Sequence, residues 1–409
     1  MLPPGDPAMS PCRFLIGLAT TLLLALGSSH AQAQARPVGE ILVMTQNQYI
    51  GADLATLFGA SSPSKLNEAV LGLLRQAAAS PFPPRAERQA AQIQARRPEL
   101  VGLQEVFHLG CRELPPRPGA CTEPGIAAAF GDHLRTTLAA LDAHGGGYEV
   151  AARVVNFDLR DALSELPGIG LLRGLPFTID GKLGLLTAYD QDVILRRQDI
   201  TTRPVTFPGC RRSAQGCNYR SEASIPLPLP GNLARIGFKR GFVGVDTAIL
   251  GRSYRFVNTH LEVAGLGDGQ ARFAAIQSAQ AAELLGALNT APRAQAGPTI
   301  VVGDFNSGPA DQRPAPIVSP YRRFEAAGFL DSWAAGFPLA RGFTCCQAAD
   351  LRNPTSILSE RIDQIFVSRP ALVRAVRLDG NQPAGKTAPV DGARLWPSDH
   401  AGVAAWLRF

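Results

Sequence analysis

Several features that would point to other classes of protein are missing from this sequence of 409 residues. No two cysteines have CxxC spacing and no histidine cluster accompanies them, which argues against a zinc-thiolate centre. No dense run of lysine and arginine marks a nucleic-acid stripe, although the formal net charge is +6. Internal repeats and coiled-coil heptads are absent, and beyond the N-terminal stretch no apolar run is long enough to span a membrane. The remaining composition is that of an ordinary soluble protein with ample apolar residues for a large core.

The N-terminal stretch has the pattern of a secretory signal peptide. Residues 1–13 are polar, residues 14–26 form an apolar run too short to span a bilayer comfortably, and small residues follow. We therefore predict a signal peptide over residues 1–35, cleaved after Ala33 or Ala35, with an uncleaved anchor as the alternative. The sequence thus predicts a secreted or periplasmic protein.

The cysteines fit an oxidising compartment. Of seven cysteines, one lies in the predicted signal peptide, which leaves an even six. Sequence proximity alone favours pairing Cys111 with Cys121 and Cys210 with Cys217, although six cysteines allow about fifteen connectivities. The adjacent pair Cys345–Cys346 is then left, either as a vicinal disulfide or as two reduced thiols.

The stretch TIVVGDFNSGP, residues 299–309, predicts a buried strand with a polar tip. Three β-branched residues, 300–302, form the strand, and glycine, serine and proline end it as a turn. Asp304 and Asn306 are two residues apart in an extended segment, so both side chains can face one crevice. A carboxylate and a carboxamide there suit a hard cation and a phosphate oxygen, although such residues often only form a strand-end turn.

Other strands with polar ends alternate with helices along the chain. We predict helices over residues 66–79, 85–97, 127–143 and 270–288. This succession argues for a single layered α/β domain over residues 36–409 whose loops form one site. Three irregular stretches read as insertions, and the apolar one is expected to be a loop folded over the core rather than a lipid-contacting hairpin. The insertions lie near residues 107–124, 159–186 and 204–230.

The polar strand ends follow an order that resembles a known superfamily. In chain order they are Asn47, Glu105 in LQEV, His260 in NTH, Asp304 and Asn306 in GDFN, Asp363 in RID, and Asp399 with His400 in SDH. This order resembles the endonuclease/exonuclease/phosphatase superfamily over essentially the whole mature chain. The resemblance implies a deoxyribonuclease-like α/β fold, a four-layer sandwich of two packed β-sheets flanked by helices. It places the active site where loops from both sheets meet.

The resemblance also implies a divalent metal. Asn47 and Glu105 would hold the ion, with Asp399 completing or approaching its shell. Oxygen ligands favour Mg²⁺ or Mn²⁺ over zinc, which prefers histidine and cysteine. We therefore expect Mg²⁺, or Mn²⁺, as the cofactor.

Phosphoester hydrolysis needs an activated water, neutralised phosphoryl oxygens and help for the leaving group. By the same resemblance, His400 is the first candidate for the base and Asp363 orients it. Asp304 would position the water or share the role of base. Asn306 would donate to a phosphate oxygen, and His260 would bind phosphate or serve the leaving group.

One further position is less defined. The segment YDQDVILRR resembles the strand that supplies an acidic partner for the first active-site histidine, so Asp190 or Asp192 could pair with His260. The other mature-chain histidines match no motif and are expected to be exposed. They are His108, His133 and His144.

The motifs indicate a phosphate-containing substrate, either nucleic acid or phospholipid. The Arg-Ile-Asp motif differs from the Cys-Asp-Arg segment of inositol polyphosphate phosphatases, and the export signal and insertions differ from abasic-site endonucleases. A secreted, nuclease-like phosphodiesterase or phosphatase is therefore our first prediction, and a phospholipid or sphingomyelin phosphodiesterase is the alternative. An inactive binding module on the same scaffold is disfavoured because Glu105, Asp304 and His400 are all present. No stable protein partner is indicated, and we expect a monomer.

Overall fold

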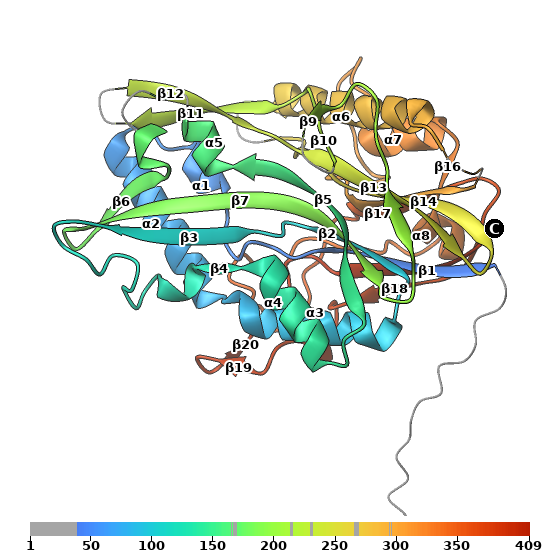
Figure 1. Ribbon diagram of the computed structural model, residues 1–409, viewed down its shortest axis with the longest axis horizontal. Helices are drawn as coiled ribbons and strands as arrows, with labels where there is room; N and C mark the ends of the chain where they lie inside the picture. The colour runs from blue at the N-terminus through green and yellow to red at the C-terminus, as the bar shows by residue number, and fades with distance from the viewer. Residues whose placement is uncertain are drawn as a thin grey trace, which may run out of the picture. The chain divides into compact units, whose positions relative to one another are not determined.

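The computed structural model describes residues 39–409 apart from 165, 167–169, 213–215, 230–231, 266–269, 294 and 296. The predicted signal peptide, residues 1–35, lies outside the described residues. Within the described chain two large β-sheets pack together, and helices cover their outer faces (Figure 1).

The strands of the first sheet are β1 (Glu40–Asn47), β2 (Leu100–Gln104), β3 (His108–Leu114), β4 (Gly131–Asp132), β5 (Tyr148–Asp158), β6 (Leu175–Ile179), β7 (Lys182–Arg197), β18 (Leu372–Asp379) and β21 (Gly402–Arg408). Their order is β18-β21-β1-β2-β7-β3-β4, and β5 and β6 also pair with β7. Because β1 and β2 are parallel, their carboxyl ends meet at the same edge of the sheet.

The strands of the second sheet are β8 (Thr202–Pro204), β9 (Arg211–Arg212), β10 (Cys217–Asn218), β13 (Gly241–Ile249), β14 (Arg252–His260), β15 (Thr299–Asp304), β16 (Phe329–Asp331) and β17 (Asp363–Ser368). Their order is β16-β17-β15-β14-β13-β10-β9, with β8 beside β13. Two separate hairpins are formed by β11 (Ala223–Leu229) with β12 (Asn232–Phe238), and by β19 (Pro389–Val390) with β20 (Ala393–Arg394).

The α-helices are α1 (Ala55–Phe58), α2 (Pro63–Ala79), α3 (Phe82–Arg96), α4 (His133–Ala143), α5 (Leu159–Ser164), α6 (Gln270–Thr290), α7 (Pro320–Ala326) and α8 (Ser332–Gly336). Short 3₁₀ turns are η1 (Ala127–Ala129), η2 (Gly170–Leu172) and η4 (Pro383–Gly385). The helix expected over residues 127–143 is therefore two pieces, separated by β4. No helix in the described ranges is long and apolar enough to cross a membrane.

Three packed cores hold four layers together. Val43 and Ile194 of the first sheet meet Val245 and Val302 of the second in the core between the sheets. Helices α3 and α4 pack on the outer face of the first sheet, and α6 and α7 pack on the outer face of the second. The predicted four-layer α/β sandwich is therefore confirmed. Strands β1 and β15 are buried along their whole length, as their short apolar runs indicate.

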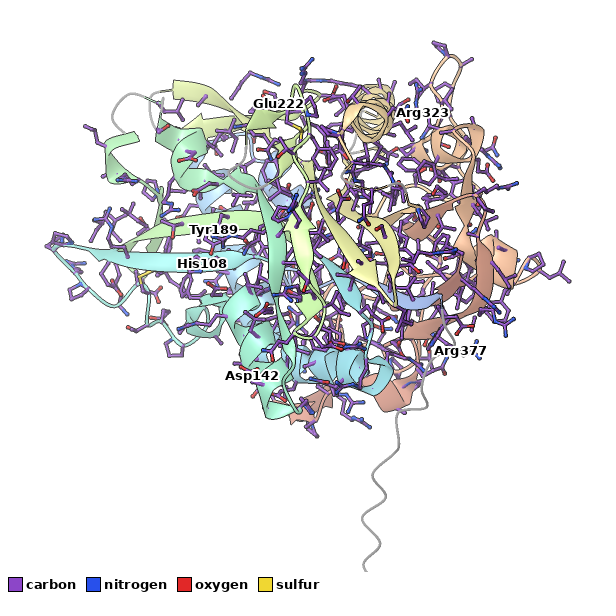
Figure 2. All side chains as sticks on the ribbon, turned by 45° about the vertical axis from the view of Figure 1, so that its right-hand side comes forward. His108, Asp142, Tyr189, Glu222, Arg323 and Arg377 are labelled. Atoms are coloured by element: carbon purple, nitrogen blue, oxygen red, sulfur yellow. A yellow bond between two sulfur atoms is a disulfide. The ribbon has the colours of Figure 1, made fainter. Side chains whose placement is uncertain are left out.

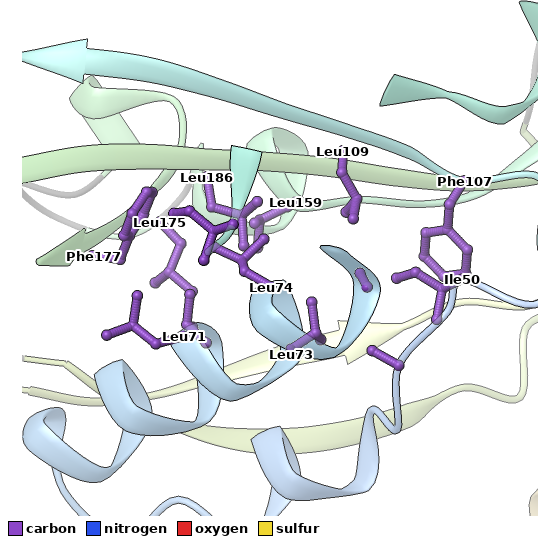
Figure 3. Close-up of a cluster of buried hydrophobic side chains, with 14 of the residues drawn as sticks. Ile50, Leu71, Leu73, Leu74, Phe107, Leu109, Leu159, Leu175, Phe177 and Leu186 are labelled. Atoms are coloured by element: carbon purple, nitrogen blue, oxygen red, sulfur yellow. The ribbon is translucent and has the colours of Figure 1, made fainter. Parts of the chain in front are cut away.

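A fourth core differs from the expected loops. Residues 159–186 contain α5, β6 and the first part of β7, so this stretch extends the first sheet instead of forming only a loop. Leu175, Phe177 and Leu186 face α2 from these strands, and Leu74 packs against them from the helix (Figure 3). Glycines and prolines in this stretch interrupt the alternation of apolar and polar residues that is typical of a strand. The sequence pattern therefore does not indicate these strands.

The described chain contains three disulfides. Both predicted local pairs are present, Cys111 with Cys121 and Cys210 with Cys217. Of the two alternatives for Cys345–Cys346, the structure has the vicinal disulfide.

Candidate active site

The strand ends of the second sheet bring three predicted site residues into one row. His260 at the end of β14 is opposite Asp304 at the end of β15, and Asp304 is opposite Asp363 at the start of β17. The apolar faces of these strands fix this register, because a slip of one residue would expose them. A Cβ on Gly303 would lie 1.9 Å from the carbonyl oxygen of Thr259, so only glycine fits before Asp304.

Asn47 links the two sheets at this edge. Its Nδ2 donates to Glu105 Oε1 at 3.1 Å and to Asp304 Oδ2 at 3.0 Å. Glu105 follows β2 with a φ of +52°, and its Oε2 accepts from the backbone nitrogen of Ile50 at 3.1 Å. The side chains at the ends of β1 and β2 therefore meet the row on the second sheet.

His400 and Asp363 form a buried hydrogen-bonded pair. His400 Nδ1 lies 2.8 Å from Asp363 Oδ2, while Nε2 lies 3.8 Å from Asp304 Oδ2 and 3.9 Å from Asp399 Oδ1. Burial alone would lower the pKa of His400, but the charges of these three aspartates outweigh burial and raise it well above its ordinary value. The pair can thus hold a proton on His400 and present Nε2 to a substrate.

A second histidine lies beside an arginine that sequence reasoning missed. Arg240 Nη1 donates to His260 Nδ1 at 3.1 Å, and His260 Nε2 lies 3.2 Å from Asn306 Nδ2 and 3.5 Å from Asp304 Oδ2. Burial, followed by the charge of Arg240, lowers the pKa of His260 well below its ordinary value. His260 is therefore a neutral imidazole. The only signal for Arg240 in the sequence is its place directly before the buried strand β13.

Neither aspartate suggested as a partner of His260 contacts it. Asp190 Oδ2 lies 3.7 Å from Arg240 Nη1, so Arg240 stands between Asp190 and the histidine. Asp192 is buried, and neither of its carboxylate oxygens has a hydrogen-bond partner in the described chain. Burial, followed by the charge of Asp190, raises the pKa of Asp192 well above its ordinary value. The carboxylate that reaches His260 is Asp304.

The three unmatched histidines occupy different environments. His144 is exposed, as expected, but His133 is buried and stacks on Phe82 with 3.6 Å between ring centroids. His108 is half-buried and stacks on Tyr189, which lies beside it on β7 (Figure 2). The expectation of exposure is therefore wrong for His133 and His108, because both rings cover apolar surface with one face.

The donor groups at the site suit a hard cation. Burial raises the pKa of Asp304 and of Asp399 to about 7, and neighbouring carboxylates add to each shift. Crowded, buried carboxylate and amide oxygens of this kind are the ligands that Mg²⁺ and Mn²⁺ prefer. The described group of three potential ligands with atoms within 4.8 Å of one another is Asp304, Asp363 and His400. Within this group Asp363 and His400 are already hydrogen-bonded to each other at 2.8 Å, which leaves them less available to a cation.

One pocket of about 770 Å³ is lined by Glu105, Arg240, His260, Asp304, Asn306, Asp399 and His400, whereas Asn47 and Asp363 are not in its wall. Its wall also includes Tyr49, Phe273, Arg313 and the half-buried Cys346. A pocket of this size accommodates a group as large as a nucleotide. Its wall therefore combines a histidine, several carboxylates, and arginine and amide donors.

A buried histidine–aspartate pair, oxygen ligands and anion-binding donors at the open edge of two packed sheets suit metal-dependent phosphoester hydrolysis. The chain belongs to the Endonuclease/Exonuclease/phosphatase family, whose sequence profile matches residues 70–400. Asn47 lies before the matched range. The predicted superfamily and the predicted enzyme class are both confirmed.

Several solved structures align with most of the chain at low identity. One is an endonuclease/exonuclease/phosphatase from Beutenbergia cavernae, with 20% identity, 90% of this chain and 72% of that chain covered, and a TM-score of 0.45. A second is the mannosyl-6-phosphatase Bt3783 of Bacteroides thetaiotaomicron, with 17% identity, 90% and 100% coverage, and a TM-score of 0.48. A third is truncated TDP2 of Caenorhabditis elegans, with 15% identity, 90% and 98% coverage, and a TM-score of 0.43. No curated protein matches the sequence significantly.

Proposed function

We propose that this protein is an exported, Mg²⁺-dependent phosphodiesterase that cleaves nucleic-acid strands. The observation that carries the proposal is the His400–Asp363 pair, whose Nε2 faces a pocket that also contains Asn306 and Arg240. Arginine together with the aromatic side chains of Tyr49 and Phe273 suits a phosphate flanked by bases. Export is supported by the N-terminal pattern and by the three disulfides.

Asn47, Glu105 and Asp399 are the residues that would hold Mg²⁺. A bound Mg²⁺ neutralises charge on the phosphoryl and leaving oxygens. The alternative, Mn²⁺, has the same preference for oxygen ligands. The negative charge gathered around Asn47 is what such an ion would balance.

Each side chain of the site has its own role in the proposed hydrolysis. Asp363 orients the ring of His400 and stabilises its protonated form; His400 must first lose that proton, and the neutral Nε2 can then take one from the attacking water. Asp304 lies between the two histidines, where it can hold that water. Asn306 and the neutral His260 bind the phosphoryl oxygens, and Arg240 supplies positive charge behind them.

A panel assay tests this function. Purified protein with Mg²⁺ is offered DNA, RNA, sphingomyelin, inositol phosphates and a simple bis-ester, with Asp304→Ala as the inactive control. We expect DNA or RNA to be cleaved fastest. Absence of Asp304-dependent hydrolysis across the panel would overturn the proposal. N-terminal sequencing of the exported protein tests the predicted cleavage after Ala33 or Ala35.

One observation favours a phospholipid phosphodiesterase as the second candidate. An apolar cavity of about 70 Å³ shares Ile50, Leu54 and Phe238 with the catalytic pocket. Helix α2, the β11–β12 hairpin and strands of the first sheet together supply most of its remaining wall. Such a cavity suits a few carbons of an alkyl chain next to the scissile phosphate. If the lipid is the substrate, filling the cavity with Val70→Phe should slow sphingomyelin hydrolysis without slowing that of the bis-ester.

A further inference from the structure

The segment Thr344–Gln347 lies between the two halves of the catalytic pair. On one side, Cys345 pairs with Glu360, three residues before Asp363. On the other side, Cys345 pairs with His400 itself. The two catalytic side chains therefore come from separate parts of the chain, and this segment pairs with both parts.

Hydrogen bonds hold the segment to the stretch of chain that ends in Asp363. Cys345 N donates to Glu360 O at 2.9 Å, and Glu360 N donates to Cys345 O at 2.8 Å. Thr344 Oγ1 accepts from the backbone nitrogens of Ile362 and Asp363, each at 3.1 Å. The backbone of the catalytic aspartate is thus held by a side chain of this segment.

Backbone hydrogen bonds also hold the segment to the residues on either side of His400. Ala401 N donates to Thr344 O at 2.7 Å, and Gln347 N donates to Asp399 O at 2.9 Å. Thr344 and Gln347, which make these bonds, directly precede and follow the Cys345–Cys346 disulfide. The disulfide therefore restricts the backbone between the two bonded residues. Cys346 is half-buried in the pocket wall, where a small dithiol can reach it.

We propose that the Cys345–Cys346 disulfide is a positioning element that keeps Asp363 and His400 aligned, and that its reduction lowers turnover. This proposal rests on the proposed phosphoesterase function. The disulfide bond accepts two electrons and two protons from dithiothreitol, giving two cysteine thiols and one cyclic disulfide of the reductant. Without the link, the backbone between the two sets of hydrogen bonds gains freedom, so the catalytic pair is less often aligned.

Misplacement of reacting groups by about 1 Å can lower rates by about 10²-fold. We therefore expect reduction to lower kcat by roughly ten- to a hundred-fold while KM changes little, because Asn306, His260 and Arg240 are on other elements. Reoxidation should restore the original kcat. A disulfide that only stabilised the fold would not separate kcat from KM in a protein that stays folded.

Variants separate this disulfide from the other two. Cys345→Ser with Cys346→Ser should have the low kcat of the reduced protein and should not respond to dithiothreitol. The matched control, Cys111→Ser with Cys121→Ser, removes a disulfide that is not in the wall of the catalytic pocket, so it should keep the normal kcat and the response. If the wild-type enzyme keeps its kcat when thiol titration shows Cys345 and Cys346 reduced, the proposal is wrong.

Two further measurements do not depend on the serine variants. Thr344→Val removes the hydroxyl acceptor and should lower kcat, whereas Thr344→Ser keeps the acceptor and should restore it. Hydrogen exchange should become faster in peptides that cover residues 359–363 and 398–401 after reduction; unchanged exchange there would count against the proposal. If the oxidised enzyme hydrolyses no phosphoester, the proposed function fails, and the exchange experiment still decides the role of the disulfide.

Discussion

The pairing of His400 with Asp363 makes a quantitative prediction for Asp363→Asn. The amide oxygen of asparagine can still accept from His400 Nδ1, but the charge that stabilises the protonated ring is lost. The pair is almost fully buried, at 7% and 2% exposure, so solvent cannot replace that charge. A positioned acid or base contributes about 10²- to 10⁴-fold, and we expect a loss of kcat in this range. This corresponds to roughly 3 to 5 kcal/mol at about 1.36 kcal/mol per factor of ten.

The fold should survive this change. Asp363 N stays bonded to Thr344, and Asp363 Oδ1 has no hydrogen-bond partner in the described chain that a substitution would remove. An asparagine amide at that position would be buried without an acceptor, which costs about 1 to 3 kcal/mol of unfolding free energy. Thermal unfolding therefore has to be measured beside turnover.

Steady-state kinetics of the single and double variants form the decisive assay. Groups that act as one unit are strongly non-additive, so Asp363→Asn with His400→Ala should be little slower than His400→Ala alone. Turnover near the wild-type value in Asp363→Asn, or losses that multiply independently, would refute the pairing. Asp304 would then become the leading candidate for the base.

Three other predictions test the metal requirement, the close backbone contact at Gly303 and the buried carboxyl group of Asp192. Hydrolysis should stop in excess chelator and return with Mg²⁺ or Mn²⁺; full activity after chelation and dialysis would contradict a metal requirement. Gly303→Ala should destabilise the protein by about 3 kcal/mol or more, because the added Cβ meets Thr259 O, and an unchanged melting temperature would count against this contact. Burial raises the folded-state pKa of Asp192, so the unfolded chain loses that proton first and the contribution of this carboxyl group to stability falls as pH rises above about 4. Asp192→Asn should therefore gain stability relative to wild type at pH 8 but not at pH 4, as denaturant titrations at both values can show.

Local sequence patterns were enough to predict an α/β fold and to place the candidate site residues at strand ends. Short β-branched runs such as Ile300–Val302 require burial on both faces, and the polar residues after them must lie at strand ends. Asn47, Glu105 and Asp304 could therefore be assigned to one edge from these patterns. The order of the motifs then identified the superfamily, because each motif is local and survives insertions between them.

Contacts between segments far apart in the chain follow only from the tertiary structure. The contact of Arg240 with His260, which separates Asp190 from the histidine, depends on how β13 pairs with β14. The position of Cys345 between Glu360 and His400 likewise depends on the packing of three distant segments. Periodicity reports only which face of an element is buried, and says nothing of which distant side chain lies opposite. For the same reason the strands within residues 159–186 became visible only through their pairing across the first sheet.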